Sequence, residues 1–191
     1  MGEQITRHYF LALELSDELK KWLRQKQRVL QSIIGEKTYR TWTDQADFHI
    51  TLAFFGKLTD VEKTTLIDKI NQLSPLKSFI IKIGDIGYFG NDHEPRVLWM
   101  RAAKNQDIER LLKQINQQMG ALNLPIDQRA FCPHVTLAKK ATNKWLTDDG
   151  WSELAANFVD SFHEKISAMV LYRVQMLHIP RYQCVERFKL E

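Results

Sequence analysis

The sequence predicts a protein of mixed α-helices and β-strands whose two halves form similar lobes. Alternating apolar stretches, which are typical of strands, are interleaved with amphipathic stretches of helical period along the 191 residues. One short pattern also occurs twice, because His-x-Thr-Leu stands at residues 49–52 and again at 134–137. A helical stretch precedes each copy. Such a duplication would place the lobes about a pseudo-twofold axis, with the two motif strands facing each other across a cleft.

The first half of the chain contains three predicted strands and two predicted helices. The strands are the stretches rich in apolar and β-branched residues, at 8–15, 39–43 and 48–55. The first helix begins after the N-cap Ser16 and ends near Gly35, with an inward stripe of Leu19, Trp22, Leu23, Leu30, Ile33 and Ile34. The second begins at the capping box of Thr59 and Glu62, with an inward stripe of Val61, Leu66, Ile70 and Leu73.

The second half begins with a predicted β-hairpin and a third helix. Asn105 is the N-cap of this helix and Gly120 marks its end, and its apolar stripe is Ile108, Leu111, Leu112, Ile115 and Met119. A polar connector is predicted for residues 141–160. The predicted strands are 79–89 and 97–102 for the hairpin, 132–140 for the second motif, one long strand at 162–177, and a final strand at 182–190.

Each His-x-Thr-Leu copy would place an imidazole and a hydroxyl on one face of a strand. Side chains alternate along a strand, so His49 lies beside Thr51, and His134 beside Thr136. The remaining motif residues would point into the core: Ile50, Leu52, Val135 and Leu137. A single copy would most simply be a structural strand with a polar outer face. Of six histidines, however, only these two are followed by x-Thr, and both are predicted mid-strand, which favours a functional pair.

Composition narrows the class of protein. An apolar fraction of 44% and a charged fraction of 26% are ordinary for a soluble globular chain. No apolar run approaches the roughly 20 residues that span a bilayer, and residues 1–6 lack the pattern of a signal peptide, so we expect a cytoplasmic monomer without a membrane partner. The net charge of +4 suits a polyanionic partner without indicating a dedicated duplex binder. Cys132 and Cys184 have no metal-binding spacing.

The two motifs lie in longer segments that resemble a known family. These segments are residues 47–56 (DFHITLAFFG) and 129–139 (RAFCPHVTLAK), supported by 10–13, 16–19, 96–99, 171–173 and 182–190. Over its whole length the chain resembles the 2H phosphoesterase superfamily, named for its two His-x-Thr motifs. Within that superfamily it is most similar to the bacterial and archaeal RNA 2′,3′-cyclic phosphodiesterases, which are also described as 2′-5′ RNA ligase-like.

The resemblance implies both a fold and an activity. The fold would be one bilobal α+β domain over residues 1–191, with two antiparallel sheets and flanking helices around a central cleft. The activity would be metal-independent hydrolysis of RNA 2′,3′-cyclic phosphate ends to 2′-phosphomonoesters, or of a small cyclic nucleotide, with no cofactor. By analogy with the family, His49 is the proton donor to the leaving 3′-oxygen and His134 is the proton acceptor that activates water. Thr51 and Thr136 would bind the phosphate.

Five further residues are candidates for binding the substrate. Arg129 and Lys139 could steer the phosphate or the RNA backbone, although both could equally be ordinary surface charges. The family often has arginine where Lys139 stands, and lysine keeps the charge but loses the bidentate fork. The family also usually has proline where Ala130 stands. Phe10 could stack on a base, as could Trp42 and Phe55, although core packing explains each of them as well.

Two other functions remain compatible with the residues alone, and a third does not fit them. The same cleft could ligate RNA through 2′-5′ linkages or cleave such linkages. The protein could bind RNA ends or nucleotides without catalysis, although such a protein would be expected to lack part of one motif. A metal-dependent hydrolase would need a cluster of His, Asp and Glu, which Asp47 alone does not make.

Overall fold

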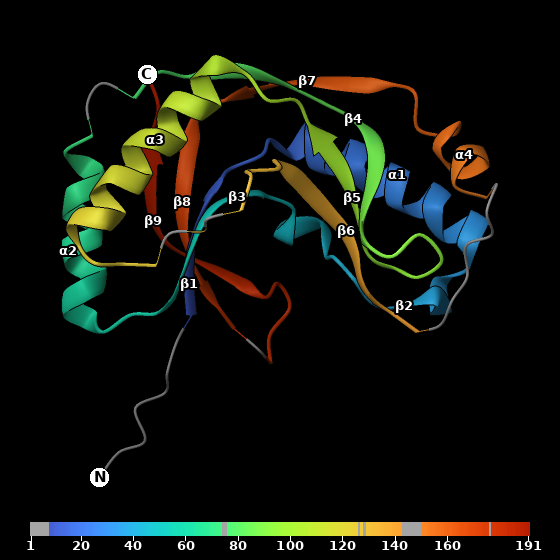
Figure 1. Ribbon diagram of the computed structural model, residues 1–191, viewed down its shortest axis with the longest axis horizontal. Coiled ribbons are helices and arrows are strands. Elements are labelled where there is room, and N and C mark those ends of the chain that lie inside the picture. The colour runs from blue at the N-terminus through green and yellow to red at the C-terminus, as the bar shows by residue number, and fades with distance from the viewer. Residues whose placement is uncertain (1–7, 74–75, 126, 128, 143–149, 176) are drawn as a thin grey trace, which may run out of the picture.

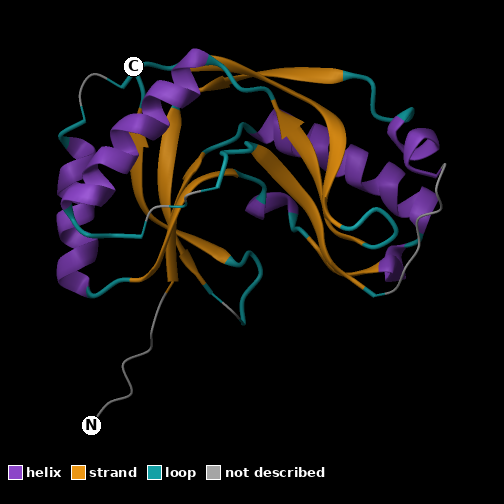
Figure 2. Ribbon diagram, viewed as in Figure 1, coloured by secondary structure: helices purple, strands orange, loops and turns teal. Residues whose placement is uncertain are grey.

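The computed structural model describes residues 8–73, 76–125, 127, 129–142, 150–175 and 177–191, and it contains two antiparallel sheets with flanking helices (Figures 1 and 2). Sheet A has the strand order β3 (Ile50–Lys57), β1 (His8–Leu13), β8 (Ala168–Val174), β9 (Tyr182–Lys189). Sheet B has the order β2 (Tyr39–Trp42), β6 (His134–Ala141), β5 (Pro95–Ala102), β4 (Phe79–Gly90), β7 (Ser161–Ile166). Each lobe therefore contains one motif strand.

The helices connect the two lobes. Helix α1 (Asp17–Ile34) follows β1 of sheet A but lies against sheet B, where the buried Gln27 side chain donates to the Leu137 carbonyl over 2.8 Å (Figure 1). Helix α3 (Gln106–Ala121) follows β5 of sheet B but packs on α2 (Asp60–Asn71), which in turn contacts β9 of sheet A. A short helix α4 (Gly150–Ala155) completes the set. Among the described residues, no helix has the length and apolarity to cross a membrane.

Most of the predicted helix signals are confirmed. Ser16 caps α1, Thr59 and Glu62 form both bonds of a capping box, and Asn105 caps α3. Gly35 ends α1 with a φ of 83°, a conformation that costs glycine little. Two inward assignments are wrong, because Ile33 is 46% exposed and Val61 is 76% exposed. Each lies at the edge of its apolar stripe, on the side of the helix that faces solvent.

The predicted long strand at 162–177 is wrong. The chain divides at Ser167 into β7, which pairs with β4 in sheet B, and β8, which pairs with β1 in sheet A. Apolar alternation continues through the break, so the pattern alone does not reveal that the two segments belong to different sheets. The predicted connector at 141–160 contains β6 as far as Ala141 and helix α4, and its residues 143–149 lie outside the described residues, as do residues 1–7.

The two motif histidines stand at strand ends and not in mid-strand as predicted. His49 directly precedes β3, and His134 is the first residue of β6. A short 3₁₀ turn, η2 (Gln45–Asp47), ends just before His49. Pro133 has no N–H to continue the ladder before His134. Both imidazoles therefore lie where the regular backbone begins, which leaves the preceding carbonyls free to bind them.

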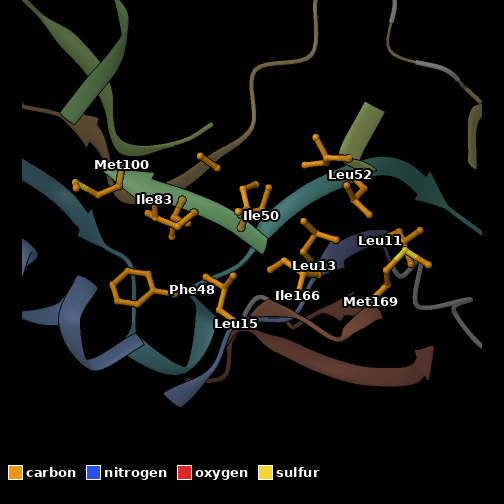
Figure 3. Close-up of a cluster of buried hydrophobic side chains, with 14 of the residues drawn as sticks. Leu11, Leu13, Leu15, Phe48, Ile50, Leu52, Ile83, Met100, Ile166 and Met169 are labelled. Carbon is orange, nitrogen blue, oxygen red and sulfur yellow. The ribbon is translucent and has the colours of Figure 1, made fainter. Parts of the chain in front are cut away.

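One hydrophobic core lies between the two sheets. It contains Leu11, Leu13 and Met169 from sheet A together with Ile83, Met100 and Ile166 from sheet B (Figure 3). The four apolar motif residues are also buried, with Ile50, Val135 and Leu137 fully enclosed and Leu52 6% exposed. Burying side chains of this size typically stabilises the fold by about 1.5–3 kcal/mol each. The motif strands are therefore held firmly against the core.

Candidate active site

The first motif holds its histidine in one orientation. The Nδ1–H of His49 donates to the Asp47 carbonyl over 2.7 Å. In the neutral ring this leaves the lone pair on Nε2, which lies 3.1 Å from the Thr51 hydroxyl. The imidazole therefore presents Nε2 on the side of the threonine, as an atom that can accept or donate a proton.

The second motif repeats this arrangement. The Nδ1–H of His134 donates to the Cys132 carbonyl over 2.7 Å, so the acceptor again lies two residues before the histidine. Thr136 follows on the same strand and, like His134, is half-buried. Each motif thus supplies one oriented imidazole with a threonine beside it.

The two motifs come together between the lobes. Residues of β3 and β6 approach to within 8 Å of one another, measured between Cα atoms, although they belong to different sheets. The charge on His134 contributes to lowering the pKa of His49, and the charge of Lys139 lowers the pKa of both histidines. The two rings and the lysine are therefore within electrostatic range of one another.

Aromatic side chains surround both imidazoles. The ring centroids of Phe10 and Tyr182 lie 4.9 Å and 5.0 Å from that of His49, and Tyr172 is 6.1 Å away. Phe89 lies 4.9 Å from His134. Burial lowers the pKa of His49 from 6.5 to about 4 and also lowers the pKa of His134. In the free protein both rings are consequently neutral at pH 7.

A β-bulge follows the threonine in each motif. The register between β1 and β3 skips Leu52, and the register between β5 and β6 skips Leu137. A bulge re-aims the side chains beyond it. As a result Phe54 and Lys139, each three residues after its threonine, face the same way as the motif histidine of their own strand. Phe10 confirms this for Phe54, because it pairs directly with Phe54 and also contacts His49.

The bulges therefore place unlike residues at equivalent positions in the two lobes. Phe54 is 54% exposed, which is unusual for a phenylalanine that is not held in the core. Lys139 is half-buried, and burial together with the nearby charge of Arg181 lowers its pKa. One side of the site is aromatic and the other is cationic.

Asp47 connects the first motif to the last hairpin of the chain. Its carboxylate is buried and accepts the backbone N–H of Arg181 over 2.9 Å and that of Tyr182 over 3.1 Å. Burial raises the pKa of this carboxyl, and the two N–H donors partly offset the rise. The carbonyl of the same residue binds His49, so one residue positions both the imidazole and the Tyr182 ring packed against it.

Asp47→Ala is expected to destabilise the fold and slow turnover. The substitution leaves two backbone N–H groups without an acceptor, which costs roughly 2–4 kcal/mol. The free energy of unfolding, measured in urea, reports this loss, and kcat falls because Tyr182 no longer packs firmly on His49. The matched control is Asp44→Ala, which removes a carboxylate that binds one exposed N–H, of Ala46, and should cost about 1 kcal/mol or less. Equal losses for the two variants would contradict this role.

The remaining sequence candidates lie in different surroundings. Phe10 is 4% exposed and stacks on Tyr172 as well as contacting His49, so it supports the ring and does not face open solvent. Arg129 is on the surface with its guanidinium paired to Asp127, at 2.9 Å from Nε and 2.5 Å from Nη2. This pairing lowers the pKa of Asp127 to about 2. Phe55 is 2% exposed and belongs to the core.

Sequence patterns missed four residues of this site. Asp47, Tyr172 and Tyr182 act through contacts that only the tertiary fold creates, since the tyrosines lie more than 120 residues beyond the first motif. Phe54 could have been found by aligning the two motifs, because Phe54 and Lys139 stand at the same offset from their histidines. Among the residues that the structure describes, no three His, Cys, Asp or Glu side chains gather into a metal-binding group.

Comparison with known families decides the relationship. Residues 15–175 match the model of the 2′-5′ RNA ligase superfamily, which is most of the chain. The protein belongs to the 2′-5′ RNA ligase superfamily. Both oriented His-x-Thr pairs lie within the matched residues.

Several relatives of this superfamily member in other organisms are named RNA 2′,3′-cyclic phosphodiesterase. The chain is 27% identical over 190 residues to the RNA 2′,3′-cyclic phosphodiesterase of Bacillus subtilis, covering 97% of this chain and 98% of that protein. It is 26% identical over 186 residues to the protein of the same name from Geobacillus stearothermophilus. That match covers 96% of this chain, but the chain spans only 57% of the Geobacillus protein's length.

Solved structures of other proteins have the same fold. Escherichia coli LigT complexed with 3′-AMP superimposes with a TM-score of 0.75 at 18% identity, covering 97% of this chain and 98% of LigT. A Thermus thermophilus protein gives a TM-score of 0.74 at 21% identity, with coverages of 96% and 97%. The bilobal α+β architecture of two antiparallel sheets with flanking helices, which the sequence predicts, is confirmed.

Proposed function

We propose that the protein hydrolyses RNA 2′,3′-cyclic phosphate ends to 2′-phosphomonoesters without a metal ion. The observation that carries this proposal is the pair of imidazoles, each fixed through Nδ1 by a carbonyl two residues earlier and each followed two residues later by a threonine. An acid and a base on opposite sides of one phosphorus are what in-line opening of a cyclic phosphate requires. The name shared by the Bacillus and Geobacillus relatives supports the same substrate.

The reaction assigns one proton transfer to each histidine. Water attacks phosphorus while Nε2 of His134 takes its proton, and the bond from phosphorus to the ribose 3′-oxygen breaks. Nε2–H of His49 donates its proton to that oxygen, and the 2′-phosphomonoester remains. Each transfer is typically worth 10²–10⁴-fold in rate.

The threonines would hold the phosphate during this step. Charge on the non-bridging oxygens grows as the pentavalent arrangement forms, and hydroxyl donors aimed at those oxygens stabilise it. Thr51 lies beside Nε2 of His49, and Thr136 follows His134 by two residues on β6, which would bring both hydroxyls near such oxygens. Phe54 and Lys139 then flank the phosphate, which suits an exposed base on one side and an anionic backbone on the other.

Incubation with a cyclic-phosphate-ended oligoribonucleotide in EDTA tests the proposal. We expect conversion to a 2′-phosphate end, identified by mass and by phosphorus NMR. Unchanged substrate would overturn the proposal and favour an RNA-end binder. Joined products, or cleavage of a 2′-5′-linked oligonucleotide in preference to the cyclic end, would instead assign the cleft to 2′-5′ linkages. We expect the protein to act on RNA in the cytoplasm, as a monomer.

The pH dependence of kcat/KM is expected to be bell-shaped, with its optimum below pH 6.5. Catalysis needs one protonated and one neutral histidine, and that form is most abundant between the two pKa values. Both values lie below 6.5, and that of His49 is about 4, so raising the pH above the higher value removes the proton that the acid must donate. At pH 8 we expect kcat/KM to be down more than about 10-fold.

The kcat profile offers a second check on this expectation. A bound phosphate favours the protonated form of both rings and therefore raises their pKa values. The kcat optimum should consequently lie at higher pH than the kcat/KM optimum. A kcat/KM profile that is flat from pH 5 to 8, or one that peaks above pH 7, would contradict the two-histidine assignment.

A further inference from the structure

A cavity of about 460 Å³ lies beside the histidine site, between α1, β2 and the final hairpin. It shares Asp47, Tyr182 and Lys139 with the surroundings of the histidines, so the two spaces adjoin. Its volume falls within the range of roughly 300–1,000 Å³ that is usual for small-molecule sites. One nucleotide unit fits a space of this size.

Three cations line this cavity: Arg24, Lys139 and Arg181. Three carboxylates also line it, Asp47, Asp44 and Glu36, and in the described part of the chain none of them forms an ion pair with these cations, although the charge of Asp47 acts to raise the pKa of Lys139. Both oxygens of Asp47 accept backbone N–H groups, and Asp44 accepts the N–H of Ala46 over 2.9 Å. The third, Glu36, is exposed to solvent. The Arg24 guanidinium donates to Gln27, which occupies one of its five N–H groups and leaves the others for a ligand.

One wall of the cavity is the indole of Trp42. Its N–H donates to the Glu36 carbonyl over 2.7 Å, and its ring meets that of Tyr39 edge-on with centroids 5.8 Å apart. Both contacts fix the plane of the ring while leaving it half-buried at the cavity. A fixed, accessible aromatic ring beside a group of cations is the usual arrangement for a base next to a phosphate.

The charge of the cavity distinguishes between two possible occupants. A nucleoside 2′,3′-cyclic phosphate carries its single negative charge on the reacting phosphorus, which the histidines and threonines would hold. Its base and sugar are neutral and would leave the three cations without a partner. An RNA chain supplies a second anion, the phosphodiester on the 5′ side of the terminal nucleoside.

Resting on the proposed function, we propose that this cavity binds the nucleotide immediately 5′ of the cyclic end. Arg24, Lys139 and Arg181 bind the internucleotide phosphate, and Trp42 stacks on the upstream base. The protein then recognises an RNA chain and not merely a cyclic nucleotide. A dinucleotide with a cyclic end should be a better substrate than the mononucleotide, mainly through a lower KM.

The test compares kcat/KM for a nucleoside 2′,3′-cyclic phosphate and for a dinucleotide that ends in the same group. In the wild-type protein we expect the dinucleotide to be favoured by at least about 10-fold, a gain within the range measured for one base stacked on an aromatic ring. Trp42→Ala and Arg24→Gln should each remove most of this preference and leave the mononucleotide rate within about 2-fold. Thermal unfolding confirms that the variants fold.

Two controls isolate the internucleotide phosphate. Arg28→Gln removes the same charge from the same helix at an exposed position outside the cavity lining, and it should keep the preference. A dinucleotide with a neutral methylphosphonate in place of the internucleotide phosphate should lose affinity for the wild-type protein and lose less for Arg24→Gln, in which only Lys139 and Arg181 still face that linkage. Equal losses in Arg24→Gln and Arg28→Gln would show long-range electrostatics only and would overturn the proposal.

Other outcomes separate this inference from the proposed function. Equal kcat/KM for the two substrates in the wild-type protein would overturn the inference while the proposed hydrolysis stands. The inference would also be overturned if Trp42→Ala lowered kcat/KM for the mononucleotide as much as for the dinucleotide. The base of the terminal nucleotide would then be the one that occupies the cavity. Turnover of neither substrate would contradict the proposed function. The affinity of the wild-type protein and of Arg24→Gln for a 3′-phosphorylated dinucleotide would then decide the inference.

Discussion

Alanine at either His49 or His134 is expected to lower kcat on a cyclic-phosphate-ended oligonucleotide by at least about 10²-fold, and by up to about 10⁴-fold. Each substitution removes one of the two proton transfers and leaves the other group without its partner. Single-turnover rates at saturating substrate measure the loss without the contribution of binding. We expect KM to change far less, because the contacts of the threonines with the reacting phosphate remain.

The pair of histidine variants also tests whether the two rings act as one unit. Groups that act together are strongly non-additive, so the double variant should be little slower than either single variant. His163→Ala is the matched control, since His163 is exposed on β7 and lies outside both motifs. It should keep the wild-type rate. A variant of His49 or His134 that retains more than about a tenth of the wild-type rate would contradict the acid–base assignment.

Valine at Thr51 or Thr136 is expected to lower kcat by about 10²–10³-fold, the second-largest effect. Valine has nearly the same shape as threonine but no hydroxyl, so the strand and its buried neighbours should be little changed. The loss arises because a donor to the phosphate oxygens is missing in the transition state. Thr64→Val, on the exposed face of α2, controls for the general effect of the substitution.

The two threonine variants should differ in their pH profiles. The Thr51 hydroxyl lies 3.1 Å from Nε2 of His49, and no equivalent bond joins Thr136 to His134 in the described part of the chain. Thr51→Val should therefore shift the pH optimum as well as the rate, whereas Thr136→Val should lower the rate at an unchanged optimum. Identical profiles for the two variants would show that the Thr51 bond does not influence the protonation of His49.

Local signals predict much of this fold because they act over a few residues. The N-caps Ser16 and Asn105, the capping box at Thr59 and the glycine end at Gly35 each depend on backbone groups within one helical turn. The break at Ser167 has no such local cause. It depends on β4 and β1, which lie in different sheets and are distant in sequence, so apolar alternation runs through it unchanged.

The site divides in the same way. The His-x-Thr pairs are visible in the sequence because the motif is short and occurs twice. The bulges at Leu52 and Leu137 are not visible in the sequence, because both leucines continue the apolar pattern. Only the pairing with the neighbouring strands, β1 and β5, shows that the register shifts there. Phe54 and Lys139 reach the site only through those bulges. The packing of Tyr182 on His49 depends on a buried carboxylate 135 residues before that tyrosine, which no local pattern indicates.

The single core between the sheets has a mechanical consequence for catalysis. The two reactive nitrogens belong to different lobes, and in the described part of the chain no hydrogen bond joins the two histidines, so we expect the packing of the apolar layer between the sheets to influence their separation. Catalytic groups misplaced by about 1 Å can cost 10²-fold in rate. Leu13, Ile83 and Met169 lie deep in that layer. Substitutions there would therefore lower kcat without touching the substrate, because they change the distance between the two catalytic imidazoles.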